Sequence, residues 1–366
     1  MLHDSELSIL FTALNIGGLT VPNRFVRSAT HDFLAGEDGT VSPAQVALYR
    51  TLAEGEVGLI ISGHAFVHPS GKAGPRQIAA HDDRFLPGLA SLAEAAHRFP
   101  SRVFLQLAHA GRQTKEKLCG CRPLAPSAVP DPSSGVTPRE MTGDEIRRTI
   151  DDFAAAGGRA ARAGFDGLQL HMAHGYLLSG FLSPHTNRRR DEWGGPLENR
   201  VRAAADIIRG IKETAGSGFP VIAKLNATDL LPGGVTAEEA VEAARLLERA
   251  GLDGLEASGG MAEAGRGSMW PGIRPEEEEG YFVPFAERIK AAVRMPVIGL
   301  GGIRSVSVMA RLVGEGRVDM ISMSRPFVRQ PGLVRGIREG RIQKTDCVSC
   351  NKCLNPRGLR CTALKP

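Results

Sequence analysis

The sequence predicts an α/β chain folded as a (β/α)8 TIM barrel, with an N-terminal hairpin as a cap and a short cysteine-rich C-terminal tail. Eight short apolar segments recur along the chain, helical spacing fills most of the intervals between them, and this periodicity stops at about residue 340. Apolar strands that alternate with helices are typical of a parallel sheet, and eight such units indicate a closed barrel. We therefore expect a barrel over residues 1–340 and a tail over residues 341–366.

The expected elements begin with LNIGGLTVP, a Gly-Gly hairpin ahead of the first barrel strand that could plug the barrel floor. Helical spacing is clearest after Asn199 and after Thr236, where apolar residues return every three or four positions. The eight strands are expected at 24–30, 57–67, 102–111, 165–174, 220–229, 252–260, 296–303 and 318–327.

Composition narrows the function classes. Apolar residues make up 42% of the chain and charged residues 23%, with no run long enough to span a membrane and no leader, so we expect a cytoplasmic protein with no membrane partner. The net charge is +5, but acids interrupt the basic runs and aromatics are only 5%, so we expect no nucleic acid either. No G-x-G-x-x-G motif occurs, and a reductant must therefore reach the barrel itself.

Polar residues gather at the expected strand ends, where barrels of this class carry their chemistry. A lone residue among them, such as His64 or His109, could be a structural polar group, but the convergence of many on one rim indicates an active site. The set comprises Thr30, His31, His64, Gln106, His109, His171, His174, Tyr176, Lys224, Asn226, Ser258, Ser324 and Arg325.

The stretch HMAHGY places His171 and His174 three residues apart. Residues three apart on a strand point to opposite faces, so the imidazoles converge only if the chain leaves strand geometry directly after His171. Zinc is a competing interpretation of this pair, but it needs a third ligand that the neighbouring sequence does not supply.

The ends of strands 7 and 8 predict a phosphorylated ligand. Gly301 and Gly302 permit close backbone approach to a phosphate, and Arg325 offers a fork of charged donors. Lys224 would be costly to bury without a partner, which an electron-withdrawing ring edge would supply. Gln106 carries a donor and an acceptor, which suits the alternating edge of an isoalloxazine.

The motifs NRFV, LQLAHAGR, HMAHGYLLSGFLSPHTNRRRDEWGGPLENR and SRPF resemble the Old Yellow Enzyme group of FMN-dependent oxidoreductases over nearly the whole barrel. The resemblance implies FMN as cofactor, with NADH or NADPH or an electron-transfer protein as reductant. It implies that Gln106 and Lys224 contact the flavin pyrimidine, that Gly302 and Arg325 hold the phosphate, and that Ala29 and Thr30 lie against the ring. The cofactor-binding set is completed from the same rim by His31, His64, Ser258, Gly301 and Ser324.

The same resemblance makes His171 and His174 the paired donors to a substrate oxygen and Tyr176 the proton donor. It implies reduction of the activated C=C bond of an α,β-unsaturated carbonyl compound, with an enoyl thioester among the candidates. His31 stands where many members have Thr or Cys, as in the dienoyl-CoA reductase branch. An amine dehydrogenase or demethylase and an electron-transfer subunit of a larger complex remain open, as does a homo-oligomer. The segment 262–282 is expected to cover part of the site, with Glu276 to Glu279 as a solvated face.

The tail carries Cys347, Cys350, Cys353 and Cys361 in the spacing C-x2-C-x2-C-x7-C. Such clustering suggests metal ligation in a reducing compartment. It resembles the segment that binds a four-iron cluster in dienoyl-CoA reductases and trimethylamine dehydrogenase, although the last gap is shorter here. We expect a [4Fe–4S] cluster, with a four-cysteine zinc site as the alternative.

Overall fold

The computed structural model describes residues 7–353 and 355–363. In this part of the chain, eight parallel strands close into a barrel in the order β4-β3-β13-β12-β11-β10-β9-β6, with β6 pairing back to β4. Each strand lies inside one of the eight apolar segments, so the predicted barrel is confirmed. The strands are β3 (Phe25–Arg27), β4 (Leu59–Ile61), β6 (Arg102–Ala108), β9 (Gly167–Met172), β10 (Val221–Asn226), β11 (Gly254–Ser258), β12 (Val297–Gly299) and β13 (Met320–Met323).

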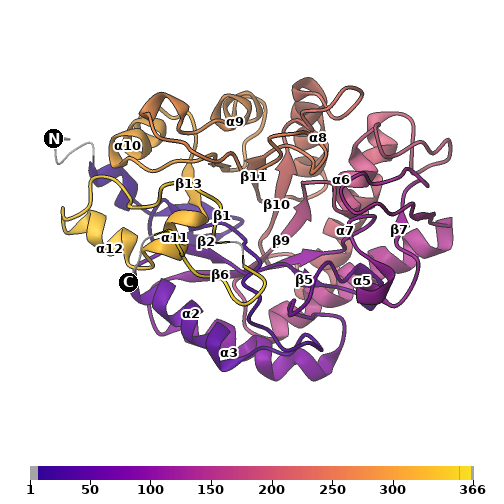
Figure 1. The fold of residues 1–366 in the computed structure, drawn as a ribbon, viewed down its shortest axis with the longest axis horizontal. Helices are drawn as coiled ribbons and strands as arrows, with labels where there is room; N and C mark the ends of the chain where they lie inside the picture. The colour runs from indigo at the N-terminus through magenta and orange to yellow at the C-terminus, as the bar shows by residue number, and fades with distance from the viewer. Residues whose placement is uncertain (1–6, 354, 364–366) are drawn as a thin grey trace.

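Helices form the outer layer of the barrel and cover the apolar outer faces of the strands (Figure 1). The two helices with the clearest sequence spacing are confirmed as α7 (Leu197–Ala215) and α8 (Ala237–Arg249). Thr236 caps α8 by accepting a hydrogen bond from the Glu239 amide. The main helices are α2 (Pro43–Glu54), α3 (Leu86–His97), α5 (Gly143–Arg162), α7 (Leu197–Ala215), α8 (Ala237–Arg249), α9 (Val283–Lys290) and α10 (Val306–Gly314).

The predicted hairpin is also confirmed, as β1 (Leu14–Ile16) paired with β2 (Leu19–Val21). Gly17 and Gly18 turn the chain at φ of 56° and 89°, a left-handed conformation that glycine adopts without steric cost. Ile16 and Val21 are fully buried in one cluster with inward-facing strand residues such as Phe104. The hairpin therefore plugs the floor of the barrel.

Shorter elements lie on the rim and beyond the last strand. The rim carries β5 (Ala65–Phe66), α4 (Glu116–Cys119), the pair β7 (Leu124–Ala125) and β8 (Arg139–Glu140), and α6 (Leu177–Leu182). After β13 come α11 (Arg325–Arg329) and α12 (Leu333–Arg338). Four short 3-10 helices are η1 (Ile9–Phe11), η2 (Pro69–Gly71), η3 (Asp83–Phe85) and η4 (Glu276–Glu278).

The cysteine-rich tail begins alongside the barrel. Val306 N donates to Gln343 O, and Thr345 N donates to Arg304 O, so residues 343–345 run beside the loop that follows β12. The division into a barrel unit and a tail unit near residue 340 stays a prediction. No helix in the described residues combines the length and the apolar character needed to cross a membrane.

Candidate active site

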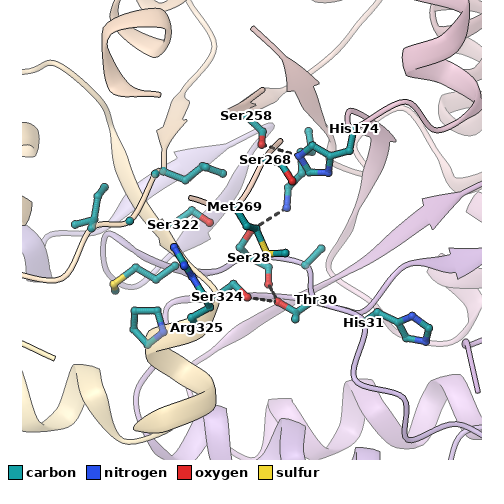
Figure 2. A pocket seen from close by; sticks show the side chains of 18 of the residues that line it. Ser28, Thr30, His31, His174, Ser258, Ser268, Met269, Ser322, Ser324 and Arg325 are labelled. Carbon is teal, nitrogen blue, oxygen red and sulfur yellow. Dashed lines mark hydrogen bonds between the residues drawn. The ribbon is translucent and has the colours of Figure 1, made fainter. Parts of the chain in front are cut away.

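A pocket of about 290 Å³ opens at the carboxyl ends of the strands (Figure 2). Barrels of this class carry their ligands at this end. The pocket is lined by every catalytic and cofactor-binding residue that the sequence suggested: Ala29, Thr30, His31, His64, Gln106, His171, His174, Tyr176, Lys224, Ser258, Gly301, Gly302, Ser324 and Arg325.

Two other strand-end residues have structural roles instead. The Nε2 atom of His109 lies 3.1 Å from Ser70 Oγ, and its ring packs under Gly71. Asn226 accepts a hydrogen bond from the backbone N–H of His174 at 3.0 Å and donates to Asp229. Asn226 therefore holds the backbone of His174 in place.

His171 and His174 meet because β9 ends at Met172 and the chain turns sharply. His174 has φ of 63° and Gly175 has φ of 85°, so the second imidazole swings back to lie 5.3 Å from the first, measured between ring centroids. His174 Nε2 lies 2.8 Å from Ser258 Oγ, as Figure 2 shows. The Nδ1 atom of His171 is buried and has no protein partner within the described chain. Buried polar atoms in folded proteins normally have a hydrogen-bond partner, so this ring nitrogen indicates that a bound group or an ordered water completes the site.

Both imidazoles are neutral. Burial, with a smaller contribution from Lys224, lowers the pKa of His174 to about 3. Burial also lowers the pKa of His171 well below its usual range, and the neighbouring His174, His64 and Lys224 add to this effect. Each ring therefore carries one N–H at neutral pH and can donate a hydrogen bond without bringing a charge into the pocket. Among the described residues no three His, Cys, Asp or Glu side chains are placed to hold a metal ion.

Tyr176 precedes α6 and lies against His171 of β9 and His64, which follows β4. Its ring centroid lies 4.4 Å from that of His171, and its hydroxyl oxygen lies 3.1 Å from His64 Nε2. Burial raises the pKa of Tyr176 to about 12, so the phenol is protonated at neutral pH. The arrangement can therefore offer a proton beside the two imidazole donors.

A buried polar network forms the floor of the pocket. Lys224 and Glu256 face each other in register on β10 and β11, with Nζ and Oε2 at 3.3 Å. Ser28 and Ser322 both donate to Glu256 Oε1, at 2.7 and 2.6 Å. Gln169 donates to Oε2 at 2.7 Å and in turn accepts from the Gln106 amide at 2.6 Å.

Glu256 is a protein partner for Lys224 that the sequence did not reveal. The sequence argument treated this lysine as lacking a partner other than a ligand, whereas a fully buried carboxylate already faces it. The sequence contained one signal of this role for Glu256. It is the single charged residue of its strand, and it lies on the same inward face as Ser258, two residues further on. The residues of this network that sequence reasoning missed are Glu256, Gln169, Ser28 and Ser322.

The opposite wall contains the features predicted to take a phosphate. Gly301 and Gly302 have φ of 127° and 70°, and a Cβ atom at Gly301 would lie 2.8 Å from Tyr281 N. Arg325 donates through Nη1 to Asn351 Oδ1 at 2.7 Å and to the carbonyl oxygens of Trp270 and Ser349. These partners are neutral oxygens, so they orient the guanidinium and do not neutralise its charge.

The segment after β11 closes over the pocket, as expected, with Ser268, Met269 and Tyr281 in its lining. Trp270 stacks on the far side of Tyr281 with ring centroids 4.3 Å apart. The segment is held by Glu263, whose Oε1 lies 2.6 Å from Arg112 Nη2. The same oxygen lies 3.1 Å from His185 Nε2.

The interpretation of Glu279 as part of a solvated face was wrong. Its Oε2 accepts hydrogen bonds from the backbone N–H groups of Arg304 and Ser305, both at 2.8 Å, and the side chain is buried. A carboxylate at the start of α10 satisfies amide groups that would otherwise lack partners. Glu276, Glu277 and Glu278 are exposed, as expected.

The four tail thiols line one small cavity of about 20 Å³, next to Arg325 and Asn351. Burial raises the pKa of Cys347, which the nearby Arg325 and Arg304 oppose, and burial also raises the pKa of Cys353. Ser349 and Asn351 have φ of 53° and 60°, so the chain turns tightly between the cysteines. Thiols are suitable ligands for an iron–sulfur cluster or a zinc ion. The described side chains of these cysteines are nevertheless not arranged as a metal site in this structure.

Several features fit the predicted FMN. The pocket joins a floor with amide and ammonium donors to a wall with two left-handed glycines and an arginine whose charge is not neutralised by its oxygen partners. The free Nδ1 atom of His171 lies on the remaining side. These are the donors that a ring with a carbonyl edge and a single phosphate would need.

Comparison with known proteins gives consistent matches. A model of the NADH:flavin oxidoreductase / NADH oxidase family matches residues 9–344. The NADH oxidase of Thermoanaerobacter brockii is 40% identical over 363 residues, which are 96% of this chain and 55% of that protein. The NADPH dehydrogenase of Geobacillus sp. strain WCH70 is 35% identical over 325 residues, covering 88% of this chain and 92% of that protein.

Among solved structures, a complex of 2-naphthoyl-CoA reductase with 2-naphthoyl-CoA superposes with a TM-score of 0.88 at 31% identity. The match covers 95% of this chain and 55% of that one. This chain thus spans about half the length of the NADH oxidase and of the solved reductase.

Proposed function

Because the chain belongs to the NADH:flavin oxidoreductase / NADH oxidase family, the Old Yellow Enzyme group, we propose that it is an FMN-dependent ene-reductase driven by NADH or NADPH. Its substrate is an α,β-unsaturated carbonyl compound, and its reaction is the reduction of the activated C=C bond. The observation that carries the proposal is the group of two neutral imidazoles and a protonated phenol on one side of the pocket, with a free ring nitrogen on His171.

The chain's own residues account for cofactor binding. Gln106 and Lys224 hold the pyrimidine edge from the floor, and Gly302 and Arg325 hold the phosphate from the opposite wall. Ala29 and Thr30 line the same pocket, and by the family resemblance they would lie against the flavin ring. When bound, FMN supplies the hydride that the substrate's β-carbon receives.

The two imidazoles bind and polarise the substrate oxygen. As hydride reaches the β-carbon, negative charge moves onto that oxygen, and two positioned N–H donors stabilise the charge. Because both rings are neutral, the substrate's oxygen does not have to compete with a bound counter-ion. Asn226 and Ser258 keep His174 in place for this role.

Tyr176 completes the addition by supplying the proton. Its O–H bond breaks as the α-carbon gains the hydrogen, and the phenolate that remains is reprotonated from solvent after the product leaves. A pKa near 12 ensures that the group is protonated when the substrate arrives.

An enoyl thioester is the substrate form that we favour. It is a conjugated carbonyl compound whose oxygen would accept from His171 and His174 in the same way, and the similar solved structure contains 2-naphthoyl-CoA, an aromatic thioester. A coenzyme A thioester also carries a large thiol portion, which stays attached during the reaction and would extend out of a pocket of this size.

Anaerobic stopped-flow spectroscopy of the purified protein tests this function. The protein should contain FMN, NADH or NADPH should bleach the flavin, and cyclohex-2-enone or crotonyl-CoA should restore its colour, whereas saturated cyclohexanone should not. Protein that takes up no FMN would contradict the proposal. Bleaching by an amine without enone turnover would favour an amine dehydrogenase, and dependence on a co-purifying protein would favour an electron-transfer subunit.

For the tail we propose a [4Fe–4S] cluster held by Cys347, Cys350, Cys353 and Cys361. The support is the shared cavity of the four thiols and their position beside Arg325, which also lines the proposed FMN pocket. Anaerobically purified protein should contain about four iron atoms and matching sulfide per chain, and Cys350→Ser should lose both. Stoichiometric zinc without iron would assign the tail to a structural metal site instead.

A further inference from the structure

The hydroxyl of Tyr176 has a protein partner that lies far away in the sequence. His64 Nε2 is 3.1 Å from the phenol oxygen, and the two rings meet edge to face at 69° with centroids 5.5 Å apart. His64 lies between β4 and β5, and only 7% of its surface is exposed. The Gln77 amide donates to the carbonyl oxygen of His64 at 3.2 Å and fixes its backbone.

The surroundings of His64 keep the imidazole neutral. Burial is the main cause of a pKa well below the usual value for histidine, and nearby cationic or titratable rings contribute further. The groups that face it from the packed elements are His31, His171, His174, Tyr176 and Lys224. One of its two ring nitrogens therefore carries a hydrogen, and the other does not.

The position of this hydrogen decides what Tyr176 can do. If Nε2 accepted a hydrogen bond, it would hold the phenol hydrogen and turn that hydrogen away from the substrate. If Nε2 donates, the phenol hydrogen stays free to reach the α-carbon. The donated bond also strengthens as the oxygen becomes negative, because charge-assisted hydrogen bonds are stronger than neutral ones.

We propose that His64 is a positioning residue that donates its Nε2 hydrogen to the Tyr176 oxygen, aims the phenol proton at the substrate and stabilises the phenolate left behind. This inference rests on the proposed function for the role of Tyr176. The proton that leaves Tyr176 goes to the α-carbon, and solvent later replaces it. His64 keeps its own proton throughout, so charge and protons balance.

The hydrogen bond donated by His64 opposes the effect of burial on the pKa of Tyr176. Burial raises the pKa of Tyr176 to about 12, and a proton donor is most effective when its pKa lies closer to the working pH. A donor to the phenolate shifts the pKa of the phenol downward. Removing the donor should therefore make Tyr176 a weaker acid and move the alkaline limit of the protonation step to higher pH.

Two variants test this inference through kinetics. His64→Leu removes the donor, and His64→Gln keeps an N–H donor on a side chain of similar reach. In single-turnover reoxidation of the reduced enzyme by an enone, we expect His64→Leu to be about tenfold slower, with its alkaline limb at higher pH, and His64→Gln to recover most of the rate. Equal rates and pH profiles for the wild type and His64→Leu would overturn the proposal.

A double-mutant cycle separates this role from a general effect on the pocket. In a Tyr176→Phe background the phenol oxygen is gone, so adding His64→Leu should change the reoxidation rate much less than it does in the wild type. The same tenfold loss in both backgrounds would show that His64 acts on something other than Tyr176.

Nitrogen-15 NMR of histidine-labelled protein gives a readout that does not depend on enone turnover. The chain has ten histidines, and the signals that disappear in His64→Gln identify His64. The proposal requires the neutral tautomer with hydrogen on Nε2; a hydrogen on Nδ1 alone, or a charged ring at neutral pH, would overturn it. If the wild type reduces no enone, the proposed function fails, and the tautomer still tests the contact itself.

Discussion

The floor and the histidine side of the pocket are both polar and both buried, yet they differ in how their hydrogen-bonding capacity is used. On the floor, Glu256 accepts from two serines and Gln169 and faces Lys224, so the polar groups satisfy one another. On the histidine side, the Nδ1 atom of His171 has no protein partner among the described residues. The floor is built to hold its shape, whereas the histidine side is built to meet a ligand.

The largest expected effect comes from breaking the floor. Glu256→Gln would leave Lys224 as a buried charge without its carboxylate, and breaking a buried pair from one side costs about 3–5 kcal/mol. Urea unfolding of the FMN-saturated protein should show this loss. Glu287→Gln makes the same chemical change in a partly exposed surface pair with Arg317 and should cost less than about 1 kcal/mol. Similar losses in the two variants would contradict the difference between floor and surface.

Substitution on the histidine side of the pocket should lower the rate of enone reduction and leave the free energy of unfolding nearly unchanged. His171→Ala removes a donor to the developing oxyanion, so enone reduction should fall roughly 10²-fold or more, equivalent to about 2.7 kcal/mol of transition-state stabilisation. Unfolding in urea should change much less than in Glu256→Gln, because the free ring nitrogen of His171 supports no protein contact. His97→Ala, at an exposed histidine paired with Asp166, is the matched control. Wild-type turnover in His171→Ala would contradict the site assignment.

A third, smaller effect is expected at the pocket wall that contains Arg325. Arg325→Ala should weaken FMN retention by about 2 kcal/mol, because it removes a charged hydrogen-bond partner from the predicted phosphate site. Ultrafiltration followed by flavin fluorescence measures the loss. Arg338→Ala, an exposed arginine just beyond, should retain FMN as the wild type does. Equal retention in both variants would remove Arg325 from the phosphate site.

The smallest effect, taken per unit of pH, concerns the decline of stability at acid pH. The pKa of His174 is lowered from 6.5 to about 3 in the folded chain, so below pH 6.5 the unfolded chain takes up a proton that the folded chain refuses. Stability is therefore full above pH 6.5 and falls towards pH 3, by about 1.4 kcal/mol per pH unit for each such imidazole. His174→Asn should make the decline between pH 6 and pH 4, taken from urea midpoints, shallower. An unchanged slope would mean that His174 titrates normally.

The sequence predicted the barrel well because its signal is local. Each strand is a short apolar run, and the turn at Gly17 and Gly18 is visible in two adjacent letters. The rim residues could be named because strand ends and a family resemblance both pointed to them. All of them except His109 and Asn226 line one pocket, although their roles remain predictions.

The contacts that could not be predicted depend on the register between neighbouring strands or join residues that are far apart in the sequence. Glu256 faces Lys224 only because β10 and β11 align in one register out of several. His64 and Tyr176 are 112 residues apart, so no local pattern links them. Glu279 looked like one of four equivalent glutamates, and only the fold shows that it reaches the amides at the start of α10.

The hairpin at the start of the chain has a kinetic consequence. With Ile16 and Val21 filling the amino end of the barrel, the described chain leaves the mouth beside the histidines as the way in. A nicotinamide and an enone would then enter through the same pocket mouth in turn. Initial rates measured at several fixed enone concentrations should therefore give parallel lines in a double-reciprocal plot, with each reactant inhibiting the other's entry when it is in excess.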